Sequence, residues 1–301
     1  MVFKNFAELI KSVQGSRKRK RVAVVAAQDE HTLMAVFKAK RNSIAEPILI
    51  GDKIKIEGVL EKLKERLDDS TIIDVENDNA AAEKAVEFIH QNKVDFIMKG
   101  KIQTSDILKA VVNKEKGLGT GNVMSHFVFN EVPNYHKLMV TTDGGMMMYP
   151  NLDEKRQIIE NAVNTLIAMG YENPKVAVLA AVEKVNPKMP ESVDAYILKK
   201  MNRSGKIKNC IVEGPISYDL AVSKKSAELK GYSSPVVGDA DILISPDITA
   251  GNILGKSLLC SAGARMAGFI VGARVPIVLT SRGSSAEEKY LSLVLSAAAV
   301  K

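Results

Sequence analysis

The sequence contains few of the residues that build disulfide frameworks and metal sites. It has two cysteines, Cys210 and Cys260, four histidines and no tryptophan. Two distant cysteines form neither a disulfide framework nor a CxxC zinc pattern, and their apolar surroundings predict that both are buried. The histidines show no HExxH or HxxxH spacing. We therefore expect a protein of a reducing compartment with no metal.

Aromatic residues and long apolar runs are also scarce. Aromatic residues make up 5% of the chain, and no apolar run approaches the roughly 20 residues that span a membrane. The first residues lack the apolar core and small-residue cleavage site of a signal peptide. We expect a soluble, cytoplasmic protein that makes no membrane contact.

The charge balance permits an anionic ligand without requiring one. Lysine and arginine outnumber aspartate and glutamate by 42 to 35, for a formal net charge of +7. The main basic run, residues 17–21, has no aromatic residue inside it, whereas aromatics among the basic residues would favour nucleic-acid binding by stacking on bases. We interpret this run as a solvated lead-in to a buried strand and expect no nucleic-acid partner.

Short apolar segments alternate with longer amphipathic segments almost from end to end. This alternation is typical of right-handed βαβ units, so we predict an α/β fold with a largely parallel sheet and helices on both faces. The predicted strands are 22–27, 47–50, 71–75, 94–98, 123–129, 138–142, 176–181, 210–212, 242–245, 268–272 and 277–280. The predicted helices include 31–41, 56–67, 80–91, 104–113, 153–169, 190–202 and 286–298.

Two small-residue stretches interrupt the alternation and mark domain joints. They are residues 117–121, with three glycines, and residues 261–268. A length of 301 residues suggests two domains at about 150 residues each, and the strand–helix unit after 268 is too short to fold alone. We predict a first α/β domain of residues 1–120 plus 269–301 and an inserted α/β domain of residues 121–268. The cleft between them is the expected ligand site.

The turn before the last helix carries the strongest candidate chemistry. Functional groups in parallel sheets gather at the carboxyl ends of strands. Here Ser281 and Arg282 lead into a helix whose free N–H groups and dipole favour an anion. Arg282 can clasp a phosphate or carboxylate with two parallel hydrogen bonds. A carboxylate at Glu287 or Glu288 can accept a proton beside that anion.

A capping role for the same acids is the alternative. Ser285 with Glu288, and Ser284 with Glu287, form two overlapping capping-box patterns. In that interpretation both carboxylates merely satisfy backbone donors at the start of the helix. Spacing alone favours this second interpretation.

A second turn, from Lys99 to Asp106, also suits an anion. Two lysines precede a helix start, which makes Lys99 and Thr104 candidate phosphate contacts. The alternative has Thr104 or Ser105 as an N-cap, with Asp106 facing the helix dipole.

Two glycine-containing segments resemble nucleotide motifs but lack a required glycine. The segment that ends in Gly-Lys-Ser at 255–257 has Ala250 where a phosphate-binding P-loop needs glycine. Gly119-Thr-Gly121 is followed by Met124, where a dinucleotide fingerprint needs its third glycine. We expect neither a nucleoside triphosphatase nor a nicotinamide enzyme.

Several motifs together resemble the phosphate acetyl/butyryltransferase family. Residues 234–256, SPVVGDADILISPDITAGNILGK, are similar to its Gly-x-Ala-x-apolar-Pro-Asp…Gly-Asn…Lys signature. Residues 142–150, TDGGMMMYP, and the turn at 281–283 also fit. The segment VNPKMP at 185–190 and the short link from 75 to 94 resemble the phosphate butyryltransferase branch. The resemblance covers almost the whole chain.

The resemblance implies a fold, a reaction and an assembly. The fold is isocitrate/isopropylmalate dehydrogenase-like, with two α/β domains and a cleft, in a homodimer or higher homo-oligomer. The reaction is reversible transfer of a short acyl group, butyryl or similar, between coenzyme A (CoA) and inorganic phosphate, without metal or prosthetic group. Phosphate acetyltransferase is the nearest alternative, and a non-catalytic acyl-CoA-binding relative is a second. A decarboxylating dehydrogenase of the same fold would need a metal-binding set of aspartates that does not occur here.

The resemblance also assigns roles to residues. Ser281 hydrogen-bonds the reacting thioester or its transition state, and Arg282 holds phosphate or the acyl-phosphate product. Glu288 stands where acetyl-specific members have an aspartate base, with Glu287 as the alternative. Lys109 replaces a family arginine and keeps the charge without the bidentate fork. The positions assigned to binding CoA or phosphate are Lys99, Thr104, Lys109, Asp143, Asn252 and Lys256.

Overall fold

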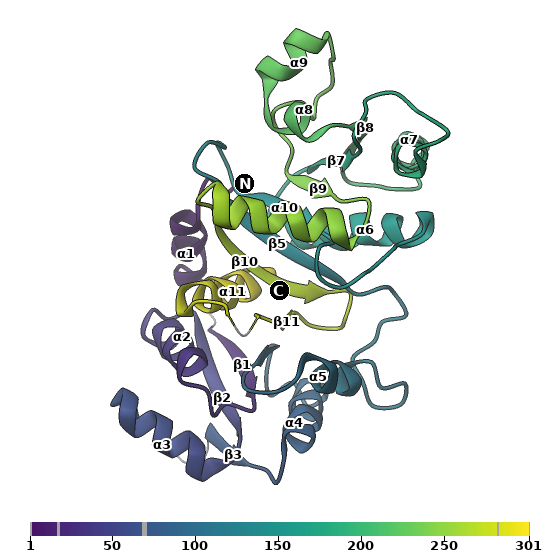
Figure 1. Cartoon of the computed structure of the whole chain (residues 1–301). Coiled ribbons are helices and arrows are strands. Elements are labelled where there is room, and N and C mark those ends of the chain that lie inside the picture. Colours follow the sequence, from purple (N-terminus) through teal and green to yellow (C-terminus); the bar gives the residue numbers. More distant parts are fainter. Residues whose placement is uncertain (1, 17–18, 68–70, 282, 301) are drawn as a thin grey trace. The chain divides into compact units, whose positions relative to one another are not determined.

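A computed structural model describes residues 2–16, 19–67, 71–281 and 283–300 (Figure 1). The chain divides into two compact units. One, which we call the terminal unit, comprises Phe6–Asn122 and Ala267–Lys301, and the other, the inserted unit, comprises Met1–Asn5 and Val123–Met266. The predicted boundaries at 120/121 and 268/269 each lie two residues from these.

The segment before Phe6 differs from the expectation. It was assigned to the first domain together with the rest of residues 1–120, but it packs into the inserted unit. The Phe3 backbone N–H donates to the Tyr171 hydroxyl over 3.1 Å, and the Phe3 carbonyl accepts from the Leu138 N–H over 2.9 Å. Phe3 is also buried, with its ring 6.0 Å from that of Tyr171. These contacts anchor the start of the chain in the inserted unit.

The terminal unit is a mainly parallel sheet with helices. Its strands, in order across the sheet, are β3 (Ile72–Asp74), β2 (Ala45–Gly51), β1 (Lys20–Val25), β4 (Phe96–Lys99), β11 (Ile277–Val278) and β10 (Arg265–Val271). All neighbouring pairs are parallel except β10 with β11. Its helices are α1 (Phe6–Gln14), α2 (Glu30–Arg41), α3 (Lys53–Leu63), α4 (Asp78–His90), α5 (Thr104–Val111) and α11 (Ala286–Ala299). Figure 1 shows α11 packed beside α1 and α2.

Helix starts in this unit follow from local sequence. Asp29, Asp52 and Asn77 are the N-caps of α2, α3 and α4, and each side chain accepts a backbone N–H of the first turn. Such caps satisfy donors that a helix cannot pair internally. They fix where each helix leaves the carboxyl end of the preceding strand.

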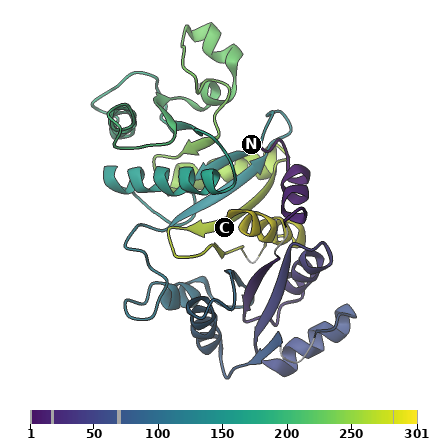
Figure 2. The ribbon, with the colours of Figure 1, turned by 180° about the vertical axis from the view of Figure 1, so that it is seen from behind.

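The inserted unit repeats this architecture. Its strands, in order, are β5 (Ser125–Glu131), β6 (Met139–Thr142), β9 (Ile242–Ile244), β7 (Lys175–Leu179) and β8 (Ile211–Ile216). Only β5 with β6 is antiparallel among these pairs. Its helices are α6 (Leu152–Ala168), α7 (Pro190–Arg203), α8 (Tyr218–Val222), α9 (Lys224–Lys230) and α10 (Ile248–Ser261). The view from behind in Figure 2 brings α6 in front of the strands, whereas α10 lies in front of them in Figure 1.

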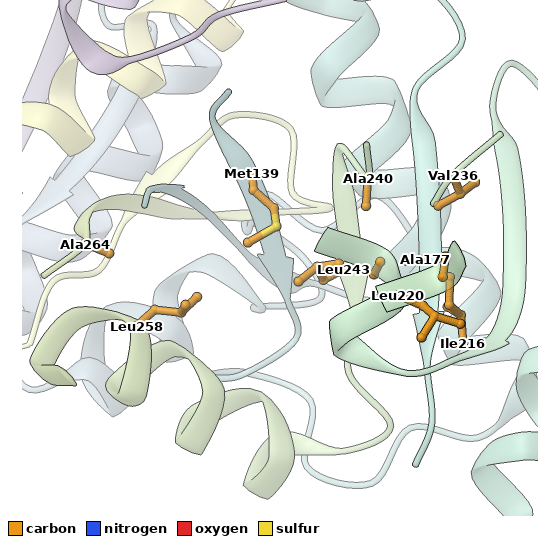
Figure 3. Packing of buried hydrophobic residues seen from close by; sticks show 11 residues of the cluster. Met139, Ala177, Ile216, Leu220, Val236, Ala240, Leu243, Leu258 and Ala264 are labelled. Carbon is orange, nitrogen blue, oxygen red and sulfur yellow. The ribbon is translucent and has the colours of Figure 1, made fainter. Parts of the chain in front are cut away.

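A core of small and branched residues holds the inserted unit together. Met139, Ala177 and Leu243, one each from β6, β7 and β9, are fully buried beside Leu220 of α8 and Leu258 of α10 (Figure 3). Removing such apolar surface from water is worth roughly 25 cal/mol per Å². This packing fixes the carboxyl ends of β6 and β9, from which the loops described below extend.

The mixed α/β class predicted from the alternation is confirmed. Every predicted strand segment overlaps one of the strands β1–β11, and the sheet pairs are mostly parallel.

Candidate active site

The turn between β11 and α11 brings two of the predicted catalytic residues together. Ser281 is exposed, Ser284 is buried with 8% of its surface exposed, and the Ser284 N–H donates to the Ser281 carbonyl over 3.1 Å. The Ser284 Oγ lies 2.7 Å from Glu288 Oε1 and 3.3 Å from Ser281 Oγ. Ser284 therefore connects Ser281 with Glu288. Arg282 lies outside the described residues, and its role stays a prediction.

The predicted capping role is confirmed for the Ser285 side chain, but the Glu288 carboxylate takes no part in the cap. Ser285 is the N-cap of α11, and its Oγ accepts the Glu288 backbone N–H over 3.1 Å. The Glu288 carboxylate accepts from the Ser284 hydroxyl instead of closing a capping box. The predicted Ser284 cap is wrong, because Ser284 precedes the N-cap and turns inward.

The residue after Glu288 is a buried lysine that the sequence motifs did not single out. Lys289 is 6% exposed, and its Nζ donates to Thr280 Oγ1 over 3.0 Å. Burial lowers the pKa of this ammonium group, against the opposing attraction of Asp29 and Glu288. The apolar run from Tyr290 onward is the signal that could have found it, since a helix that is apolar all round is buried.

Lys99 lies at the same sheet edge as this turn. The parallel register pairs Ile277 with Ile97 and Val278 with Met98, and Lys99 is the last residue of β4, directly after this pairing. Lys99 is 6% exposed, and its Nζ is 3.5 Å from the Gly100 carbonyl. A Cβ on Gly100 would lie 2.3 Å from the Ala26 carbonyl oxygen, so only glycine allows this turn to approach β1 so closely.

The other two candidates of the terminal unit are on the surface of α5. Thr104 is the first residue of α5, and its N-cap is Gln103, with no side-chain cap bond. The prediction of Thr104 or Ser105 as the N-cap is therefore wrong, because the helix starts one residue earlier. The Lys109 side chain is 76% exposed and pairs with Asp106 over 3.1 Å.

Asp143, in the inserted unit, shapes a loop after β6. It is 2% exposed, and its carboxylate oxygens accept four backbone N–H groups over 2.7–3.1 Å. The donors are His126, Gly145, Met146 and Met147. These bonds fill most of the hydrogen-bonding capacity of a carboxylate. Any part of Asp143 in substrate binding would act through the loop that it holds.

Asn252 contacts that same loop from α10. Its Nδ2 donates to the Gly144 carbonyl over 3.1 Å. A Cβ on Gly251 would lie 2.3 Å from the Asp143 carbonyl oxygen, and one on Gly144 would lie 2.7 Å from the Gly251 carbonyl carbon. The paired glycines therefore let α10 pack directly on the loop, which brings Asp143 and Asn252 together. Lys256 lies one helical turn further along, on the exposed face of α10.

The same exposed face corrects the expectation for the cysteines. Cys210 is buried as predicted, and burial raises the pKa of its thiol to about 12. Cys260 is exposed, because it follows Lys256 by one turn on the outer side of α10.

In the part of the chain that the structure describes, no group of three or more histidine, cysteine, aspartate or glutamate residues is placed to hold a metal ion. None of the described helices is long and apolar enough to cross a bilayer.

Comparison with known proteins places these features in a family. A family model described as "Phosphate acetyl/butaryl transferase" matches residues 5–90 and 79–297. A phosphate butyryltransferase of Clostridium acetobutylicum is 43% identical over 296 residues, which are 98% of this chain and 98% of that protein. A phosphate acetyltransferase of Thermotoga maritima is 44% identical over 290 residues, covering 96% of this chain and 98% of that protein.

A solved structure agrees with these sequence matches. The crystal structure of a branched-chain phosphotransacylase from Enterococcus faecalis superposes with a TM-score of 0.81 and 33% sequence identity, covering 93% of this chain and 98% of that one. The resemblance drawn from the motifs is thereby confirmed: this chain is an acyltransferase that belongs to the phosphate acetyl/butyryltransferase family.

Proposed function

We propose that this enzyme transfers a short acyl group reversibly between CoA and inorganic phosphate, so that acyl-CoA and phosphate give acyl phosphate and CoA. Family membership supports the reaction class. The observation that carries the assignment of the site is the hydrogen-bonded row of Ser281, Ser284 and Glu288. It lies at the start of α11, which also carries the buried Lys289.

In the direction that forms acyl-CoA, Glu288 is the proposed base. A CoA thiol has a pKa of roughly 8.5 and is a poor nucleophile until it loses its proton. Glu288 takes that proton, the thiolate sulfur bonds to the carbonyl carbon, and the bond from that carbon to the phosphate oxygen breaks. Phosphate leaves with the electron pair and takes up the proton from Glu288, directly or through solvent, so that hydrogen phosphate is released and Glu288 is ionised again. In the reverse direction hydrogen phosphate attacks the thioester and gives its proton to Glu288, which passes it to the departing sulfur.

Charge in this reaction develops on phosphate and on the carbonyl oxygen. The Ser281 hydroxyl is exposed and free to donate to the tetrahedral oxyanion. Arg282, Lys99 and the free N–H groups of α11 are proposed to hold phosphate. Lys109, Thr104, Asn252 and Lys256 are proposed as further contacts to the phosphates of CoA.

The acyl group is proposed to be butyryl or a branched four-carbon chain. The VNPKMP segment at 185–190 and the similarity to a branched-chain phosphotransacylase favour this choice. The near-equal identities to a butyryl and an acetyl enzyme keep acetyl as the alternative. We also propose the isocitrate/isopropylmalate dehydrogenase-like arrangement, a homo-oligomer, no prosthetic group, and a cytoplasmic location where CoA thioesters and phosphate are available.

Release of free CoA thiol from acetyl-, butyryl- and isobutyryl-CoA, with and without phosphate, tests this proposal. We expect phosphate-dependent release that is fastest with a four-carbon donor. Fastest release from acetyl-CoA would keep the chemistry and overturn the acyl preference. No release from any of the three would overturn the activity and favour a non-catalytic acyl-CoA-binding protein.

A further inference from the structure

Ser284 is a buried hydroxyl that links the proposed base to the proposed oxyanion donor. It is 8% exposed, its Oγ is 2.7 Å from Glu288 Oε1, and the same atom is 3.3 Å from Ser281 Oγ. The resemblance assigns Ser284 no role, and the helix cap predicted for Ser284 does not form, because Ser285 is the N-cap of α11. Resting on the proposed function, we propose that Ser284 is a positioning residue that couples the protonation state of Glu288 to the hydrogen bond donated by Ser281.

Other hydrogen bonds already fix the main chain of Glu288, so Ser284 controls the orientation of its side chain. The Ser285 Oγ accepts the Glu288 N–H over 3.1 Å, and the Ser292 Oγ donates to the Glu288 carbonyl over 2.8 Å. Ser292 is itself held by the Gly268 N–H over 3.1 Å. A glutamate is one methylene longer than an aspartate and has one more rotatable bond. The hydrogen bond from Ser284 fixes the carboxylate that this extra bond would otherwise leave free.

The direction of the hydrogen bonds among Ser281, Ser284 and Glu288 depends on whether Glu288 carries a proton. When Glu288 is ionised, its carboxylate can only accept hydrogen bonds. Ser284 then donates a hydrogen bond to Glu288 and accepts one from the Ser281 hydroxyl. When Glu288 has taken the thiol proton, it can donate to Ser284, which then donates to Ser281. The Ser281 proton is thereby released for the substrate oxyanion, and each hydroxyl still carries one proton. The base thus prepares the oxyanion donor at the moment when negative charge develops.

The geometry fits this sequence of events. The contact between Ser284 and Glu288 has a length typical of a hydroxyl donating to a carboxylate. The 3.3 Å contact between Ser284 and Ser281 is longer than the usual hydroxyl pair. Catalytic hydrogen bonds are often long in the free enzyme and shorten when substrate binds. The exposed Ser281 hydroxyl can move closer to the Ser284 hydroxyl, whereas the Glu288 carboxylate is already at hydrogen-bonding distance from it.

The test compares Ser284→Ala with Ser285→Ala. The two serines are neighbours at the start of one helix, and both contact Glu288, but Ser285 meets only its backbone N–H. With butyryl-CoA and phosphate, Ser284→Ala is expected to lower kcat by roughly ten- to a hundredfold with both KM values within about twofold. Ser285→Ala is expected to lower Tm and leave kcat within about twofold.

Conservative variants keep the test decisive if Ser284→Ala fails to fold. Ser284→Thr retains the hydroxyl and is expected to retain most of kcat, while Ser284→Cys, a weak donor of similar size, is expected to reproduce the loss. In a Glu288→Gln background, removing the Ser284 hydroxyl is expected to cost little more, because the two act as a unit.

The outcomes separate this inference from the proposed function. Wild-type enzyme that does not turn over acyl-CoA and phosphate would overturn the proposed function. Full activity of Glu288→Gln would overturn Glu288 as the base. Active wild type and an impaired Glu288→Gln, together with a Ser284→Ala that loses only Tm, would overturn the role of Ser284 alone.

Discussion

At the scale of single residues, the turn from Thr280 to Lys289 separates the residues expected to do chemistry from those that hold the turn. The exposed Ser281 and the partly exposed Glu288 can reach a ligand, whereas Ser284 and Lys289 are buried behind them. Substitution of the first pair should therefore affect turnover more than stability, and substitution of Lys289 should affect stability with a definite dependence on pH.

Ser281→Ala should fold normally and lose most of its activity. The exposed hydroxyl contributes little to packing, so the free energy of unfolding should change by less than about 0.5 kcal/mol. Loss of an oxyanion donor should lower kcat by a factor of roughly 10² to 10³. Ser204→Ala, which removes another exposed serine hydroxyl, should leave kcat unchanged. A Ser281→Ala enzyme with the wild-type kcat would remove Ser281 from the site, and Arg282→Ala tests the neighbouring guanidinium in the same way.

Lys289→Met should stabilise the protein at neutral pH. The buried ammonium loses hydration on folding, and methionine fills similar space without a charge, so we expect a gain of about 1 to 2 kcal/mol. Because burial lowers the folded-state pKa of Lys289 below its usual 10.5, the unfolded chain binds this proton more tightly. The cost of the charge is therefore fully present below the folded pKa and is lost as pH rises towards 10.5.

Urea unfolding of both proteins at pH 7 and pH 10 checks this prediction. The advantage of Lys289→Met should be smaller at pH 10 than at pH 7. An advantage that is the same at both pH values would show that the ammonium charge is not its source.

At the scale of elements, the position of α10 depends on two glycines in contact. Gly144 in the loop after β6 and Gly251 in α10 approach so closely that neither has room for a Cβ. Asn252 then reaches the loop and donates to the Gly144 carbonyl. The Gly-Asn pair that the sequence shares with the family signature therefore has a packing role in this chain.

Gly251→Ala should destabilise the inserted unit. Its Cβ would meet the Asp143 carbonyl oxygen at 2.3 Å, so α10 must shift, at a cost of about 1 to 3 kcal/mol. Gly255→Ala is the matched control in the same helix, because nothing lies within 4 Å of its Cβ. Helix propensity predicts a gain of up to about 1 kcal/mol for this control. Denaturant unfolding measures both, and equal gains for the two variants would contradict the packing role.

The same scale shows why some elements could be predicted from sequence and others could not. The strand predicted at 210–212 extends in the structure to Ile216, through Gly214 and Pro215. Glycine and proline argue against a strand locally, but pairing of Ala177 with Glu213 and of Leu179 with Ile216 keeps this segment in the sheet. The short helices α8 and α9 were not predicted, because five and seven residues contain too little periodicity.

At the scale of the whole molecule, alternating apolar and amphipathic segments were enough to predict the α/β class, whereas the predicted domain boundaries came from the small-residue stretches at 117–121 and 261–268. Turn spacing pointed to Ser281 and to a carboxylate at Glu287 or Glu288, and the family resemblance favoured Glu288 as the base. The bridging position of Ser284 depends on which way its side chain turns, and the depth of Lys289 depends on packing of α11 against other helices. The direction of the Ser284 side chain is not a property of local sequence and needed the structure, whereas the apolar run from Tyr290 onward already indicates that Lys289 is buried.

The proposed reaction requires that the acyl group pass to phosphate and not to water. Phosphorus NMR of the enzyme with butyryl-CoA and inorganic phosphate tests it most directly. We predict that an acyl-phosphate signal appears as inorganic phosphate falls, and that adding CoA to the product reverses the change towards the same equilibrium. Release of CoA with no acyl-phosphate signal would identify thioester hydrolysis instead and would contradict the account.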